Sequence, residues 1–358
     1  MAYIKALFSF ILAFIQILIP IASVGLSGSD AYFTKWDEST VYTEDYAVEL
    51  EKNPGEDFVI LNLTDIQLSF GEEYGYPGKL AKATVDKLVE ETDPDLITVT
   101  GDNAWSLDSY NDMIKMLDGY GIPWAPVMGN HDGQGCISEK WCAARFVQAE
   151  NCLFKFGPEG MGYGNYIINI TENGSIIHTL FMMDSHSDIQ KTNINGEKGS
   201  GYDHFWPEQL KWYEWAVNGI KKTAGKTVES TVFMHIPVVE YKTAWEEAYD
   251  IDNSCYKQEY SSSSFGVNHE GVCCAPQNNG FFALCKDLNS TKNMVCGHDH
   301  VNSSSILYDG IRLTYGIKCG KGCYWEEEMS GGTTISVGSD GSASIEHIFV
   351  APSELDIK

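Results

Sequence analysis

The stretch Gly129-Asn130-His131-Asp132 directly follows the apolar run Ile122-Pro-Trp-Ala-Pro-Val-Met128. This pattern predicts a strand whose end delivers an amide oxygen, an imidazole and a carboxylate to one place. Glycine and asparagine are also ordinary turn residues, so the stretch gains weight only from similar blocks elsewhere. Four such blocks follow other apolar runs: Leu63-Thr64-Asp65-Ile66-Gln67, Thr100-Gly101-Asp102-Asn103, Met234-His235-Ile236-Pro237 and Gly297-His298-Asp299-His300.

The first half of the chain alternates strand and helix patterns. Strands are expected at 58–63, 96–100 and just before Gly129, and helices at 79–91 and 110–117. The carboxyl ends of such strands are where ligands collect in layered α/β proteins. The fold class predicted is therefore α/β.

The second half has a more antiparallel pattern, which predicts a second sheet packed on the first. Asn173-Gly174 is a strong hairpin signal between strands at 166–170 and 176–183. Pro207 begins a helix that is expected to reach Ile220. Further strands are expected at 231–234, 294–296, 311–315, 333–337 and 343–349. With no linker visible, we expect one domain over 55–352, preceded by an acidic, poorly ordered segment at 24–54.

The five blocks together supply ligands for metal ions. Divalent cations are held by carboxylates, imidazoles and amide oxygens. The predicted ligands are Asp65, Gln67, Asp102, Asn130, His235, His298 and His300. This inventory suits two divalent ions (Mn, Zn, Fe, Mg or Ca) that share Asp102. Such a pair lowers the pKa of bound water toward ~7 and clamps a phosphoryl centre, which predicts hydrolysis of a phosphate ester.

His131 is expected to act as a catalytic acid instead of a ligand. Its imidazole would donate a proton to the leaving alkoxide, and Asp132 would hold the ring and keep it charged.

These blocks resemble the calcineurin-like metallophosphoesterase superfamily. Finer features resemble its purple-acid-phosphatase-related, Dcr2-like branch: Thr100-Gly-Asp-Asn103, Tyr163-Gly-Asn-Tyr166, Trp206-Pro-Glu-Gln209, Phe233-Met-His-Ile-Pro237, Asn279-Gly-Phe-Phe282 and Gly297-His-Asp-His-Val-Asn302. The resemblance implies a four-layer αββα sandwich of two mixed sheets flanked by helices. It also implies one metal at Asp65, residue 67, Asp102 and His300, and another at Asp102, Asn130, His235 and His298.

Two positions depart from the pattern of that family. The family has histidine where this chain has Gln67, whose amide oxygen is a weaker and harder ligand than imidazole. Purple acid phosphatases have a tyrosine ligand three residues after the shared aspartate, where this chain has Trp105. We therefore expect a colourless protein without tyrosinate-bound ferric iron.

Three functions are compatible with this sequence. The first is a secreted phosphomonoesterase. The second is a phosphodiesterase or pyrophosphatase that uses the same metals on cyclic nucleotides, nucleotides or phospholipid head groups. The third is a non-catalytic surface binding protein on a decayed phosphatase scaffold, which Gln67 favours and the retention of the other ligands opposes.

The beginning of the chain predicts an extracytoplasmic location. Residues 1–23 contain Lys5, a long apolar run and then small residues, as in a signal peptide, although an uncleaved membrane anchor is the alternative. The protein would then be secreted or lie in the endolysosomal lumen, and it would contact a membrane only through an uncleaved anchor. The net charge of −26 argues against nucleic-acid partners.

An oxidising compartment would favour disulfides and glycosylation. Cys136 with Cys142 and Cys319 with Cys323 are close enough in sequence to pair. Acceptor sequons begin at Asn169, Asn173, Asn289 and Asn302, and a fifth at Asn62 is expected to stay unmodified inside a strand.

The remaining histidines and aromatic residues have weaker signals. His178, His269 and His347 are interpreted as ordinary strand or loop residues, whereas His186 and His204 could line the substrate cleft. Trp105, Tyr202 and Trp206 could stack on an organic leaving group or simply pack.

Overall fold

The apolar run Phe58–Leu63 forms strand β2, which lies in the middle of a five-stranded sheet. Its neighbours β3 and β4 run parallel to it, whereas β13 and β14 are joined antiparallel on the other side. The computed structural model describes residues 32–68, 76–134, 137–189, 201–355 and 357. The order in this sheet is β14 (Ala343–Phe349), β13 (Gly331–Val337), β2, β3 (Leu96–Thr100) and β4 (Trp124–Val127).

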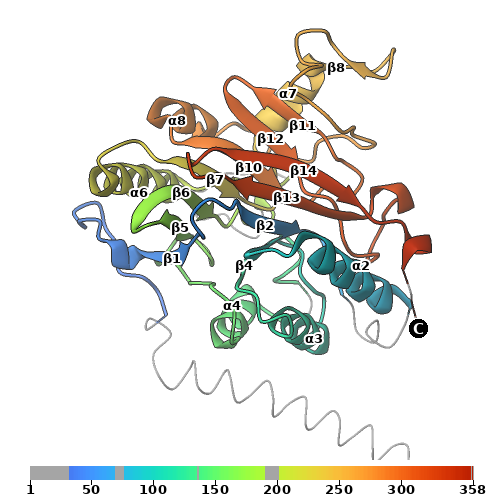
Figure 1. Cartoon of the computed structure of the whole chain (residues 1–358), viewed down its shortest axis with the longest axis horizontal. Coiled ribbons are helices and arrows are strands. Elements are labelled where there is room, and N and C mark those ends of the chain that lie inside the picture. Colours follow the sequence, from blue (N-terminus) through green and yellow to red (C-terminus); the bar gives the residue numbers. More distant parts are fainter. Residues whose placement is uncertain (1–31, 69–75, 135–136, 190–200, 356, 358) are drawn as a thin grey trace, which may run out of the picture.

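A second sheet of seven strands faces the first (Figure 1). Its centre is parallel, from β6 through β7 and β10 to β12; β5 pairs antiparallel with β6, β11 pairs antiparallel with β12, and β1 pairs in parallel with β5. The order is β1 (Ala47–Glu51), β5 (Tyr166–Glu172), β6 (Ser175–Met182), β7 (Glu229–Phe233), β10 (Thr291–Cys296), β12 (Ile311–Tyr315) and β11 (Ser305–Tyr308).

The side chains of β5 and β6 show that the seven-stranded sheet is buried on both faces. Ile168 and Leu180 join the core that lies against the five-stranded sheet, whereas Ile167 and Phe181 join the core under the other helices. Successive residues of a strand point to opposite faces, so two cores on one strand require a layer on each side. The predicted four-layer α/β sandwich of two mixed sheets is therefore confirmed.

The helices are divided between the two outer faces (Figure 1). The helices on the five-stranded sheet are α2 (Tyr76–Thr92), α3 (Leu107–Asp118) and α4 (Glu139–Gln148). The helices on the seven-stranded sheet are α6 (Pro207–Ala224), α7 (Val239–Ala248) and α8 (Phe281–Leu288). Helix α3 begins after Ser106, whose hydroxyl accepts a hydrogen bond from the Ser109 N–H, and α6 has Pro207 in its first turn.

The short elements correct the prediction of poor order for residues 32–54, the part of that segment that the structure describes. Strand β1 pairs in parallel with β5, and Trp36 and Tyr42 pack against Trp215 of α6. These aromatic contacts bury apolar surface, which is why an acidic segment is ordered here. The other short elements are η2 (Glu44–Tyr46), β8 (Tyr249–Asp250), β9 (Cys255–Tyr256), η4 (Glu327–Met329) and η5 (Pro352–Glu354).

The expected strands and helices form, with ends that shift by a few residues. The hairpin at Asn173-Gly174 is confirmed, and both residues have the positive φ that its turn requires. The prediction that the second half is mainly antiparallel is wrong for β6, β7, β10 and β12. The division of sheets by halves is also wrong, since β13 and β14 join the sheet of β2.

The predictions of a signal peptide, disulfides and glycosylation can be compared with the structure only where it describes the residues concerned. The signal peptide at 1–23 and Cys136 lie outside the described residues. All nine described cysteines are free, so the pair Cys319–Cys323 is not formed. Asn169 and Asn302 are buried, while Asn173 and Asn289 are exposed. Within the described ranges, no helix combines the length and the apolar character needed to cross a bilayer.

Candidate metal centre

The five predicted blocks follow five strands at their carboxyl ends. Strands β2, β3 and β4 of one sheet deliver the first three blocks, and β7 and β10 of the other sheet deliver the last two. The edges of the two sheets meet, and this brings residues more than 200 positions apart into contact: the His298 N–H donates to Asp65 Oδ2 at 3.1 Å. The five blocks therefore converge at the carboxyl ends of their strands, as the sequence predicts.

The backbone is strained where it presents these side chains. Asp65, Gln67, Asp102 and His298 all have positive φ, between 47° and 79°. Residues other than glycine reach this region at a cost of about 1–3 kcal/mol, and they keep it where the surrounding structure holds them. Four such residues in one cluster mark it as a candidate functional site.

Two glycines of the blocks allow the turns to approach closely. A Cβ on Gly129 would lie 2.3 Å from Asp102 Oδ1, and a Cβ on Gly297 would lie 2.0 Å from Thr64 Oγ1. Any other residue at these positions would push the ligand-bearing turns apart.

The Nε2 atom of His235 is the centre of a cluster of hydrogen-bond acceptors. His235 Nδ1 donates to the Thr100 carbonyl at 2.8 Å, so in the neutral ring Nε2 carries a lone pair. Three more polar atoms face it: Asn130 Oδ1 at 2.9 Å, Asp102 Oδ1 at 3.3 Å and His298 Nδ1 at 3.3 Å. The two oxygens can only accept hydrogen bonds, so the arrangement favours a proton or a cation at its centre.

The ionisation of the buried groups agrees with that preference. Burial lowers the pKa of His235, but the charges of Asp102 and Asp65 raise it further, so its pKa is raised overall. Burial raises the pKa of Asp65, but the hydrogen bond and charge of His300 with the charges of His235 and Lys318 lower it overall. Burial and the charge of His235 lower the pKa of His298 well below its usual range, which leaves that ring neutral.

A divalent cation fits this cluster. Buried, unpartnered atoms face it or lie beside it, namely His298 Nε2 and Asp65 Oδ1, and such orphans are rare in folded proteins. Ligand atoms of Asp65, Asp102 and His235 lie within 4.8 Å of one another. Carboxylate, amide oxygen and imidazole form a donor set suited to Mn²⁺, Zn²⁺ or Fe²⁺. Asp102, Asn130, His235 and His298 could therefore hold one ion.

The residues do not fit a second ion in the same way. Gln67 was predicted to ligate through its amide oxygen, but Oε1 instead accepts a hydrogen bond from Lys318 Nζ at 2.8 Å. The Gln67 amide nitrogen faces Asp102 Oδ2 at 2.8 Å and His300 Nε2 at 3.2 Å. The side of the cluster nearest His300 thus receives an N–H donor where a ligand was expected.

His131 lies at the open edge of the cluster. Its ring nitrogen Nε2 is 3.9 Å from Asp102 Oδ2, and its side chain is 31% exposed. Trp105 packs on the ring with 4.5 Å between centroids, and His131 Nδ1 donates to Gln134 Oε1 at 2.8 Å. The free Nε2 atom therefore faces both the cluster and solvent.

Asp132 does not hold the ring of His131, which corrects the predicted role. Its carboxylate is buried and accepts hydrogen bonds from the Gly129 N–H, the N–H and Nδ2 of Asn103, and the Tyr110 hydroxyl. Asp132 instead locks the turn of Asn130 to the turn of Asp102. Gln134, which the sequence did not single out, contacts the ring.

The aromatic residues divide into two groups. Trp206 stacks on His186 at 3.8 Å inside the protein, so neither residue lines the open edge. Tyr202 packs edge-on against His298 at 4.3 Å, and Tyr324 stacks on His300 at 4.2 Å. Tyr324 and Lys318 were missed because nothing in their local sequence marks them.

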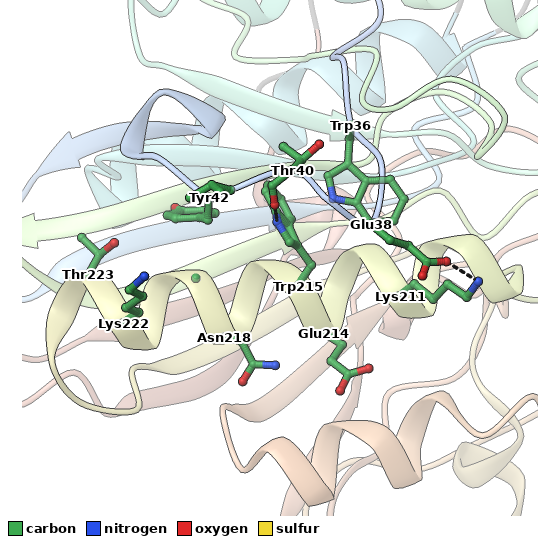
Figure 2. Close-up of a pocket in the computed structure, with 12 residues that line it drawn as sticks. Trp36, Glu38, Thr40, Tyr42, Lys211, Glu214, Trp215, Asn218, Lys222 and Thr223 are labelled. Carbon is green, nitrogen blue, oxygen red and sulfur yellow. Dashed lines mark hydrogen bonds and ion pairs between the residues drawn. The ribbon is translucent and has the colours of Figure 1, made fainter.

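A cavity of about 670 Å³ lies elsewhere, between the N-terminal segment and α6 (Figure 2). Trp36, Tyr42 and Trp215 line it, and none of the predicted ligands does. The chemistry of the metal cluster therefore does not extend to this cavity.

The sequence profile described as "Calcineurin-like phosphoesterase" matches residues 58–302, which span all five blocks. The chain belongs to the calcineurin-like phosphoesterase family. This family hydrolyses phosphoric esters, which confirms the class of enzyme and the resemblance that the blocks indicated.

Two similar proteins come from the branch expected. "Probable inactive purple acid phosphatase 14" of Arabidopsis thaliana is 27% identical over 304 residues, 75% of this chain and 71% of that protein. "Phosphatase DCR2" of Saccharomyces cerevisiae is 29% identical over 333 residues, 85% of this chain. The match spans only 54% of the yeast protein. A dimetal phosphatase of Danio rerio aligns in structure over 82% of this chain and 99% of its own, with 12% identity and a TM-score of 0.46.

Proposed function

We propose that this protein is a metal-dependent phosphomonoesterase in which His131 is the leaving-group acid. The observation that carries the proposal is the set of polar atoms around His235 Nε2. Asp102, a member of this set, lies 3.9 Å from His131 Nε2 at the open edge. When bound, a divalent cation supplies Lewis acidity toward phosphoryl oxygens and acidifies water. The preference for monoesters is supported by the name of the yeast relative, a phosphatase.

The residues of this chain then have separate tasks. Asp102, Asn130, His235 and His298 hold the cation, and Asp132 keeps the turns of Asp102 and Asn130 in register. Gln134 Oε1 accepts a hydrogen bond from His131 Nδ1 and so directs Nε2 toward the substrate. A proton at Nε2 would pass to the alkoxide of the leaving group.

The second candidate is a non-catalytic binding protein, which two observations favour. Gln67 offers no ligand atom to the cluster, and the name of the Arabidopsis relative describes it as inactive. In either case we propose a secreted or lumenal protein, because the apolar run near the start of the chain is typical of a signal peptide.

Hydrolysis of para-nitrophenyl phosphate and of its bis-ester, before and after chelation and restoration of Mn²⁺ or Zn²⁺, tests the proposal. We expect metal-dependent turnover, faster on the monoester, that falls ~10²-fold or more in His131→Ala. The control is His269→Ala, a surface histidine whose ring pairs with Glu326. A preference for the bis-ester would favour a phosphodiesterase, and no turnover with any metal would favour the binding protein.

A further inference from the structure

The Gln67 side chain has both ends occupied by hydrogen bonds. Its Oε1 atom accepts from Lys318 Nζ at 2.8 Å, and its Nε2 atom donates to Asp102 Oδ2 at the same distance. The same nitrogen lies 3.2 Å from His300 Nε2. All four residues are at least 94% buried, so these contacts have little competition from water.

The orientation of the amide follows from its partners. An ammonium group only donates, so the atom that faces Lys318 must be the amide oxygen. His300 Nδ1 donates to the Tyr324 carbonyl at 2.9 Å, which leaves the lone pair of the neutral ring on Nε2 to accept from Gln67. Turning the amide over would set an NH₂ group against Lys318 and an oxygen against two acceptors.

Lys318 brings a positive charge to this side of the cluster. It follows β12 and forms a parallel bridge with Thr64, which sets its side chain beneath the turn of Asp65. Its Nζ atom donates to the Asp65 carbonyl at 2.8 Å as well as to Gln67, and the residue is only 3% exposed. A buried ammonium next to two carboxylates supplies part of the charge that a metal ion would otherwise bring.

The two sides of the cluster therefore differ in whether a side-chain N–H donor already bonds the acceptor atoms. Around His235 Nε2, the oxygens Asn130 Oδ1 and Asp102 Oδ1 converge on a ring nitrogen that can bind them only through a proton or a cation. Near His300, the acceptors Asp102 Oδ2 and His300 Nε2 already have a donor in Gln67. Asp65 Oδ1 lies 3.3 Å from His300 Nε2, and the Asp65 carboxylate is also within reach of an ion beside His235.

We infer that Gln67 and Lys318 replace the first of two metal ions, so that this protein works with a single divalent cation. That ion lies at Asp102, Asn130, His235 and His298, and His300 is not one of its ligands. The inference rests on the proposed function for the existence of the ion and departs from it in the number of ions and in the role of Lys318.

Metal content of the chelated protein after equilibration with Mn²⁺ and removal of free ion tests the inference. The native chain should hold one equivalent, with the electron paramagnetic resonance spectrum of an isolated Mn²⁺ ion. His298→Ala should weaken binding by more than ~100-fold, since loss of an outer-shell partner alone costs ~10–100-fold. The matched variant His300→Ala should keep one equivalent, because His300 Nε2 faces Gln67 and Asp65 Oδ1 and is not among the proposed ligands.

The double variant Gln67→His with Lys318→Met tests the converse, namely whether a second ion binds once Gln67 and Lys318 are replaced. It returns an imidazole and removes the ammonium charge, so we expect a second equivalent of Mn²⁺ and the spectrum of a coupled pair. Circular dichroism checks that each variant is folded.

Two equivalents in the native chain, one of them lost in His300→Ala, would overturn the inference and leave the proposed function intact. No bound Mn²⁺ in the native chain would overturn both.

Discussion

The Asp132 carboxylate accepts hydrogen bonds from both turns that hold the candidate metal ligands, and an amide in its place could not accept all of these bonds. Asp132→Asn sets an NH₂ group against at least one N–H or hydroxyl donor inside the protein. An unsatisfied buried donor costs about 1–3 kcal/mol, so the free energy of unfolding should fall by that amount. Urea denaturation measures this loss.

Asp86→Asn is the control for that prediction. Asp86 is exposed and pairs with Lys82 on the surface of α2, where one ion pair contributes little. Its stability should stay within about 0.5 kcal/mol of the native value. If Asp132→Asn were as stable as this control and had lost only activity, a direct catalytic role for Asp132 would replace the positioning role.

Gln134 should affect turnover through the orientation of His131. Gln134→Ala removes the acceptor at Nδ1, and we expect kcat to fall ~10-fold because the ring loses its alignment with the leaving group. Gln134→Glu keeps an oxygen at the same place and should stay within ~3-fold of the native kcat. Steady-state kinetics on para-nitrophenyl phosphate distinguish the two variants, and equal kcat values for Gln134→Ala and the native protein would refute this role.

At the scale of residues, the convergence of the candidate ligands could be predicted because each block combines suitable residue types with a strand end. Asp102, Asn130 and His235 follow three different strands, and the Asp102 and Asn130 oxygens come within 3.3 Å of His235 Nε2 in this way. Lys318 could not be found in this way, since it lies 251 positions from Gln67 and meets it only through sheet topology. Asp132 was misassigned because sequence adjacency to His131 says nothing of the direction in which its side chain points.

Helix α6 holds the N-terminal segment through a close contact at Gly219. A Cβ on this residue would lie 2.3 Å from Tyr42 Cβ, although alanine is otherwise ~1 kcal/mol better than glycine inside a helix. We expect Gly219→Ala to lower the free energy of unfolding by about 1–3 kcal/mol through overpacking. Limited proteolysis should also cut residues 32–54 more rapidly in this variant.

Asn218→Ala, one position earlier on α6, separates the contact from the helix propensity. Asn218 is exposed and its side chain points away from Tyr42 (Figure 2). This variant should be within about 0.5 kcal/mol of the native protein. If both variants were equally stable, the packing of the N-terminal segment on α6 would not contribute to stability.

At the scale of elements, periodicity predicted the strands and helices that bury one continuous apolar face. It missed α4, α7 and α8, whose surroundings contain turn residues, and β1, whose partner β5 lies more than 100 residues away. The parallel order of β6, β7 and β10 was also out of reach. Pairing of distant strands depends on the crossover helices and leaves little trace in the local sequence.

At the scale of the whole molecule, His178 joins the two sheets. It lies on β6, and its Nδ1 donates to the carbonyl of Gly341 in the turn between β13 and β14 at 2.7 Å. Its Nε2 accepts from the Thr231 hydroxyl at 3.0 Å. Burial lowers the pKa of His178 to about 4, so the ring is neutral in the folded protein.

This pKa predicts a loss of stability in mild acid. Between pH 6.5 and about 4 the unfolded chain binds a proton at His178 and the folded chain does not, so stability falls as the pH falls. The contribution reaches about 3 kcal/mol at the lower end. His178→Gln should remove it, seen as a smaller difference in unfolding free energy between pH 7 and pH 4.5.

The comparison of variant with native protein isolates His178 from groups that act in the opposite direction. Burial raises the pKa of Asp184 to about 7 and of Asp299 to about 6, so their protonation favours the folded state in the same range. His269→Gln, at the surface, is the control. An unchanged pH dependence in His178→Gln would contradict the assignment of a neutral buried ring.

We propose that residues 55–352 form one domain to which the segment before residue 55 adds an edge strand. Each sheet contains strands from both halves of the chain, so neither half could complete a sheet alone.

Anomalous diffraction from crystals grown with Mn²⁺ distinguishes one bound ion from two. We expect one anomalous peak among Asp102, Asn130, His235 and His298, with Lys318 still bonded to Gln67 and no peak beside His300. A pair of peaks that share Asp102, or no peak at His235, would contradict this expectation.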